Sequence, residues 1–181
     1  MFSKGIILFF LVILIYDITQ ISSKLEFTNV KCNSKDKKFF EFEYCYIKSV
    51  NRSYKYISLK TRFYSLPINE ATASLQILRR FRSFMPITMN VTVDICKFKT
   101  GKKSILNPML ELFDDVSKKY TNLNHSCPYD HDLVIEKLPT DYLNRHFTDV
   151  LPLPPGEYVF NSIWFHKGIE RATIRIYSTI S

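Results

Sequence analysis

The side chains that most often carry catalysis are sparse in this sequence and follow no catalytic spacing. Its histidines, His125, His131, His146 and His166, include no two at a spacing that shares one helical face or fits a known metal signature. No Gly-x-Ser-x-Gly elbow is present, so a hydrolase would need a Ser-His-Asp triad assembled only in space. We therefore predict a protein that is not an enzyme and has no metal, and we keep a secreted hydrolase as a less favoured alternative.

Composition excludes several other classes. The chain of 181 residues has 4 glycines, too few for phosphate-binding loops or dinucleotide fingerprints, so no cofactor is expected. Its residues are 46% hydrophobic and 15% aromatic, which is enough to form a core and argues against intrinsic disorder. The length after removal of a leader matches one domain.

The first 23 residues have the layout of a secretory signal peptide. Lys4 supplies a positive charge, and Ile6 begins an apolar run that continues to Tyr16. The run is shorter than the roughly 20 residues that span a bilayer, so cleavage near Ser22 or Ser23 is favoured over a retained signal anchor. We predict a secreted, extracellular protein with one domain over residues 24–181.

Two further features fit an extracellular protein. Asn51, Asn90 and Asn124 each begin an acceptor sequon for N-glycosylation. The cysteines form an even set, which in an oxidising compartment makes two disulfides from three possible connectivities. The four are Cys32, Cys45, Cys96 and Cys127. Loop length favours pairing the first two and the last two, and no pair has the close spacing of a zinc knuckle.

Alternation of large apolar and polar residues predicts β-strands. In residues 38–47 one face carries Phe40, Phe42, Tyr44 and Tyr46, and the other carries Glu41, Glu43 and Cys45. The same period recurs in residues 56–64, 88–98, 132–138, 157–165 and 169–179. His166-Lys167-Gly168 separates the last two strands and is typical of a hairpin turn. Short strands without alternating long helices predict an all-β antiparallel sandwich.

One segment has helical periodicity instead. Six apolar residues spaced three and four apart share a face, and Asn107 and Pro108 suit the start of a helix. The six are Leu106, Met109, Leu110, Phe113, Val116 and Tyr120. Asp114 and Asp115 are expected on the opposite, solvated face. Residues 139–156 contain several prolines and are expected to form a long irregular loop.

Positive charge and aromatic residues gather in one predicted hairpin. The formal net charge is +8, and the segment between Leu78 and Pro86 holds three arginines among phenylalanines. The residues concerned are Arg79, Arg80, Phe81, Arg82 and Phe84. In an extracellular protein such a tip suits an anionic membrane surface or a receptor rather than nucleic acid. Dispersed charge that only aids solubility is the alternative.

The order of these motifs resembles a known family. The segments that carry the resemblance are Asn29-Val30-Lys31-Cys32, residues 44–48, residues 90–98, the amphipathic helix, residues 124–129 and residues 153–158. Together they are similar to a large insect family of small secreted domains of unknown function. That family is related to the CheB-like chemosensory proteins and, more distantly, to the ML lipid-recognition domains. The resemblance covers residues 29–179, and relatives often have glycine and asparagine where this chain has the basic tip.

The resemblance implies an immunoglobulin-like sandwich whose interior admits a lipid tail. The expected ligand is a small apolar molecule such as a fatty acid, sterol or hydrocarbon, with a role in chemosensation. Alternation alone selects the candidate lining residues Phe40, Phe42, Tyr44, Phe63, Phe113, Phe160 and Trp164. The alternative is an interaction module with a filled core, because aromatic residues at these positions can equally pack against one another.

Overall fold

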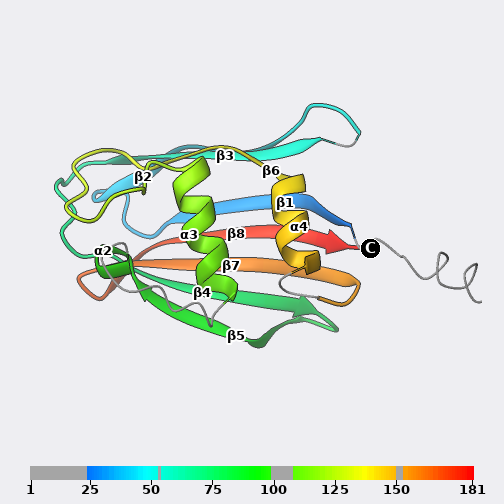
Figure 1. The fold of residues 1–181 in the computed structure, drawn as a ribbon. Helices are drawn as coiled ribbons and strands as arrows, with labels where there is room; N and C mark the ends of the chain where they lie inside the picture. The colour runs from blue at the N-terminus through cyan, green and yellow to red at the C-terminus, as the bar shows by residue number, and fades with distance from the viewer. Residues whose placement is uncertain (1–23, 53, 99–107, 150–152) are drawn as a thin grey trace, which may run out of the picture.

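The structure, a computed structural model, describes residues 24–52, 54–98, 108–149 and 153–181. The described chain is mainly β-strand, in antiparallel sheets that pack together (Figure 1). The larger sheet has the strand order β1-β8-β7-β4-β5. Its strands in chain order are β1 (Leu25–Ser34), β4 (Thr72–Arg80), β5 (Phe84–Asp94), β7 (Gly156–His166) and β8 (Ile169–Ile180). The predicted signal peptide, residues 1–23, lies outside the described residues.

The smaller sheet has the order β2-β3-β6 and completes the sandwich. Its strands are β2 (Phe40–Ser49), β3 (Lys55–Phe63) and β6 (Val134–Pro139). This architecture confirms the predicted all-β antiparallel sandwich. The disulfide between Cys32 of β1 and Cys45 of β2 joins the two sheets, with the Cα atoms 6.3 Å apart. A second bridge joins Cys96 and Cys127, so the favoured connectivity is confirmed.

The turn between β7 and β8 confirms the predicted hairpin. His166 pairs with Ile169, which leaves Lys167 and Gly168 as a two-residue loop. Both residues have positive φ, 51° and 72°, the backbone that a turn of this length needs to match the twist of its strands. Glycine at the second position adopts that conformation without steric cost.

The register of β2 corrects the predicted faces of that strand. Phe42 pairs with Thr61 while Tyr44 pairs with Lys60, so Glu43 is an extra residue that forms a bulge. One inserted residue reverses the alternation from that point onward. Cys45 therefore faces the interior and meets Cys32. Tyr46, expected on the same face as Phe40, is 42% exposed.

The predicted amphipathic helix is present as α3 (Pro108–Tyr120), with Pro108 at its first position. Leu106 and Asn107, which the sequence also assigned to it, lie outside the described residues. Asp114 departs from the expected solvated face: it is 5% exposed and its carboxylate lies 2.6 Å from the Lys118 ammonium. Asp115 accepts a hydrogen bond from the Tyr142 hydroxyl, which explains why the pair faces a neighbouring element rather than water.

Two expected elements differ in the structure. The predicted strand over residues 88–98 ends at Asp94, and α2 (Ile95–Phe98) follows as a short helix. The Asp94 carboxylate accepts hydrogen bonds from the backbone N–H groups of Cys96 and Lys97, a cap that begins a helix. The expected irregular loop over residues 139–156 contains α4 (Thr140–Asp149), which buries Tyr142 and Leu143.

Helices α3 and α4 lie across one open side of the sandwich, in front of the sheets in Figure 1. Helix α3 contacts β5 and β6, which belong to different sheets, and α4 contacts β1, β3 and β6. The sandwich is thus closed along one side by the β1 to β2 disulfide and covered along another by helices. The core between these layers includes Phe27, Ile57 and Ile77, each at most 1% exposed.

Candidate ligand-binding cavity

A cavity of about 160 Å³ lies between the two sheets and α3. Strands of both sheets contribute aliphatic and aromatic side chains, and α3 supplies one wall. Residues that line it include Leu59 of β3, Leu75 of β4, Phe113 and Val116 of α3, Ile135 of β6, Phe160 and Trp164 of β7, and Ile174 of β8. An apolar cavity of about 150 Å³ can hold a benzene-sized molecule, so this volume is large enough for a small ligand or part of a longer one.

Smaller cavities of about 80 Å³ and 50 Å³ continue this space along the sandwich. Trp164 and Leu123 line all of these cavities. The 80 Å³ cavity also shares Leu59 and Ile174 with the 160 Å³ cavity, so the two are neighbours.

Most of the aromatic residues selected from the sequence lie at this interior. Phe113, Phe160 and Trp164 line the 160 Å³ cavity, Phe40 and Phe63 line the 80 Å³ and 50 Å³ cavities, and Phe42 lines the 80 Å³ cavity. Tyr44 is not among the residues that line these cavities. The bulge at Glu43 explains its position, because it turns Tyr44, together with Tyr46, to the face opposite Phe42. The ring centroids of the two tyrosines lie 5.7 Å apart.

The sequence-based prediction of lining residues selected only aromatic side chains and missed the aliphatic ones. Leu59 and Ile174 both belong to predicted strands and could have been found from their alternation. Leu123 follows α3 in a segment without regular secondary structure, and no periodic signal predicts that it is 6% exposed and lines the cavities.

Polar groups beside the 160 Å³ cavity already have partners within the protein. The Trp164 indole N–H donates to the Ser162 hydroxyl at 3.0 Å, and the Thr121 hydroxyl donates to the Ser117 carbonyl at 2.6 Å. The Ser117 hydroxyl in turn donates to the Asp114 carbonyl. Because these groups are satisfied, the cavity favours a ligand that makes apolar contacts and asks for few hydrogen bonds.

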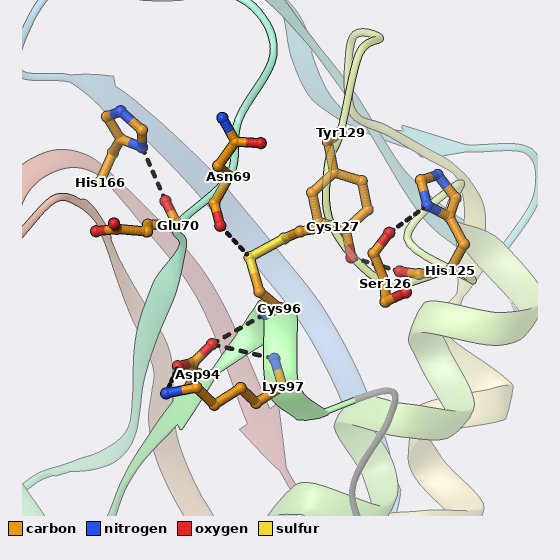
Figure 2. The surroundings of a disulfide bond; sticks show 10 residues. All are labelled: Asn69, Glu70, Asp94, Cys96, Lys97, His125, Ser126, Cys127, Tyr129 and His166. Atoms are coloured by element: carbon orange, nitrogen blue, oxygen red, sulfur yellow. Dashed lines mark hydrogen bonds and ion pairs between the residues drawn. A yellow bond between two sulfur atoms is a disulfide. The ribbon is translucent and has the colours of Figure 1, made fainter.

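The Cys96–Cys127 disulfide connects α2 to the segment that follows α3 (Figure 2). Beside it, Asp94 caps α2 and lies 3.2 Å from the Lys97 ammonium. Burial acts to raise the pKa of Asp94, but hydrogen bonds from Lys97 and Cys96 and the charge of Lys97 bring the pKa below its usual value. Its stabilising contribution is therefore present above the unfolded pKa and is lost as the pH falls through the lowered value.

The basic tip lies at the turn between β4 and β5. Phe81 and Met85 are 64% and 54% exposed, and Arg82 is exposed beside them. Arg79 donates to the Pro155 carbonyl at 2.9 Å, and Arg80 pairs with Glu157 at 2.7 Å. The sequence analysis grouped these arginines with Phe81 and Phe84. The structure shows that Arg79 and Arg80 also attach the tip to the start of β7.

The predicted glycosylation sites have the exposure that modification requires. Asn51, Asn90 and Asn124 are all exposed. Their use as glycan acceptors stays a prediction.

Residues 73–160 match a family model described as a protein of unknown function, DUF1091. This segment is similar to that family. It runs from Ala73 in β4 through α4 to Phe160 in β7 and contains the bridge between Cys96 and Cys127. The cavity therefore combines residues of the matched segment, such as Phe113, with Trp164 and Ile174, which follow it. None of the curated proteins matches this chain.

Two features are absent from the residues that the structure describes. No helix in the part of the chain that the structure describes is long and apolar enough to cross a membrane. Over the same described ranges, no group of three or more His, Cys, Asp or Glu side chains is arranged to hold a metal ion.

Proposed function

We propose that this protein binds a small apolar ligand, such as a fatty acid, sterol or hydrocarbon, in the space between its two sheets. The observation that carries the proposal is the series of apolar cavities that share Trp164 and Leu123. Each methylene moved from water into such an interior contributes about 0.8 kcal/mol, so a hydrocarbon chain can bind with few polar contacts. Secretion and a role in chemosensation belong to the same proposal, supported by the two disulfides and by the resemblance to secreted insect domains.

Native mass spectrometry of the protein secreted from insect cells tests this proposal. We expect a bound mass above that of the glycosylated chain, which solvent extraction removes and identifies as lipid. A protein that carries no extractable mass and takes up no fluorescent fatty acid or sterol at micromolar concentration would contradict it. Turnover on a panel of esters or glycosides would instead favour the hydrolase alternative.

Replacing Trp164 with phenylalanine is expected to weaken binding without unfolding the domain. The change removes part of the wall common to the cavities, an apolar loss of one to two methylene equivalents that corresponds to about tenfold in the dissociation constant. Displacement of a fluorescent fatty acid measures the affinity, and circular dichroism checks the fold. Since Trp164 is the one tryptophan in the chain, quenching of its emission in the wild type reports ligand entry directly. Unchanged affinity in a folded variant would reject its role.

An interaction at an anionic membrane surface is the second candidate function. It is favoured by the exposure of Phe81 and Met85 beside Arg82, because an apolar tip with a neighbouring cation suits a headgroup interface. Such a tip would act together with a ligand cavity or, if the cavities stay empty, in place of it.

Changing Phe81 to serine together with Arg82 to glutamine tests that second candidate. The double change keeps the Arg79 hydrogen bond to Pro155 and the Arg80 ion pair with Glu157, and it removes the Phe81 ring that lies 5.2 Å from the Arg79 guanidinium. We expect binding to phosphatidylserine vesicles to fall on the order of a hundredfold, from the loss of one phenyl ring and one charge near the surface. Vesicle sedimentation measures the loss, and Lys167→Gln, at the exposed turn between β7 and β8, is the control. Equal binding by all three proteins would rule out the tip as the contact.

A further inference from the structure

Two histidine side chains meet in the segment between α3 and β6. The Nε2 atoms of His125 and His131 lie 2.9 Å apart, and their ring planes are inclined at 67°. His125 is exposed and His131 is partly exposed, so both nitrogens are near solvent. Six positions separate the two residues in the sequence, and no regular element places them together.

The position of both rings is held by a buried tyrosine. Tyr129 is 2% exposed, and its ring centroid lies 4.9 Å from that of His125 and 5.9 Å from that of His131. The Tyr129 hydroxyl donates to the His125 carbonyl at 2.7 Å, as Figure 2 shows. The neighbouring Cys127 is bonded to Cys96, which anchors this segment to α2. The pair is therefore arranged before any ligand binds.

The second nitrogen of each ring faces a backbone carbonyl. The His125 Nδ1 atom lies 2.7 Å from the Ser126 carbonyl oxygen, and the His131 Nδ1 atom lies 3.0 Å from the Asp132 carbonyl oxygen. For His125, donation from Nδ1 to this carbonyl places the proton on Nδ1 and leaves a lone pair on Nε2. This is the arrangement found in histidines that bind metals through Nε2, because the carbonyl fixes both the tautomer and the ring orientation.

We propose that His125 and His131 together bind one divalent transition-metal ion through their Nε2 atoms, with Cu²⁺ preferred. At metal–nitrogen distances of about 2.0 to 2.1 Å, two nitrogens 2.9 Å apart subtend an angle of about 90° at the ion. That angle suits the square-planar or tetragonal geometry of Cu²⁺, which also has the highest affinity in the first-row series. Water completes the coordination, and ligands that are both imidazole disfavour Ca²⁺ and Mg²⁺.

Proton positions are consistent with metal entry. Without an ion, the Asn122 amide, 3.0 Å from the His131 Nδ1 atom, can donate to it while the His131 Nε2–H donates to the His125 Nε2 atom. When the ion binds, the His131 proton moves through solvent from Nε2 to Nδ1, where the Asp132 carbonyl accepts it. Neutral imidazoles therefore bind the ion with no net release of protons.

Titration of the untagged, secreted protein with Cu²⁺ tests this site. We expect one ion per chain and an electron paramagnetic resonance spectrum with hyperfine coupling from two imidazole nitrogens. His125→Asn and His131→Asn each keep an amide near the position of Nδ1 and remove Nε2, so each should lower the affinity on the order of tenfold or more. His166→Asn makes the same change where Nδ1 lies 2.8 Å from the Glu70 carbonyl, and it should leave the affinity unchanged.

The controls separate this site from other copper ligands and from the apolar cavity. Thermal unfolding shows that each variant is folded, and if His131→Asn is not, the His125→Asn variant decides the outcome alone. Wild-type affinity in a folded His125→Asn variant, or loss of binding in His166→Asn, would overturn the proposal. Uptake of apolar probes does not enter this experiment, so the metal site and the proposed ligand function can fail independently.

Discussion

Replacing Cys96 and Cys127 together with alanine is expected to lower the free energy of unfolding by about 4 kcal/mol. The two residues are 31 positions apart, and loss of the bridge returns the closure entropy of that loop to the unfolded chain. The loop also carries α3, which forms one wall of the 160 Å³ cavity. Urea unfolding, followed by circular dichroism, measures the change.

The other bridge provides the comparison for this prediction. Cys32 and Cys45 are 13 positions apart, so their joint replacement with alanine should cost about 3 kcal/mol on the same basis. The two losses should also differ in their effect on ligand uptake, because the loop closed by Cys96 and Cys127 carries α3 and the loop closed by Cys32 and Cys45 does not. A loss below about 1 kcal/mol for Cys96 and Cys127 would show that α3 and its flanking segments hold their place without the covalent link.

Filling the main cavity is expected to abolish uptake of apolar probes while the domain stays folded. Val116 lies on the inner face of α3 and lines the cavity of about 160 Å³. In the Val116→Phe variant a benzene-sized ring enters this space, which is comparable to apolar cavities that hold benzene. We expect the affinity for a fluorescent fatty acid to fall on the order of a hundredfold, because the lost burial equals three to four methylenes.

An exposed position on the same helix supplies the control for that variant. Glu111→Phe adds the same ring to the outer surface of α3 and should leave uptake at the wild-type level. Thermal unfolding of both variants checks that the helix is intact. Full uptake by a folded Val116→Phe protein would place the ligand elsewhere and remove the main support for the proposed function.

Local pattern was sufficient for most elements of the sandwich. The period-two segments became strands, and the apolar face of residues 109–120 became α3. Pairing of the cysteines followed loop length. The periodic pattern gave the wrong end for the strand predicted over residues 88–98. Asp94 caps a helix there, so the last residues of that range form α2 instead of strand. The pattern also failed at α4, where flanking prolines obscured a helix whose buried Tyr142 and Leu143 pack on the core.

Bulges explain why the inward faces could be predicted only in part. Thr28 in β1 and Glu43 in β2 are each an extra residue relative to the partner strand. Each one reverses the alternation, and the two reversals turn Cys32 and Cys45 inward and Tyr44 outward. A bulge has no strong local signal, because its cost is offset by pairing and burial along the rest of the strand.

The sequence by itself determined the all-β class, the period of most strands and the amphipathic helix, since each depends on spacing along the chain. The same spacing selected seven aromatic residues for the interior, and six of them line the cavities. Tertiary structure alone decided how large the interior space is, because cavity volume depends on how side chains from both sheets and α3 meet. It also decided that His125 and His131 face each other. Their contact depends on the buried ring of Tyr129 and the bridge at Cys127, which no local pattern relates to them.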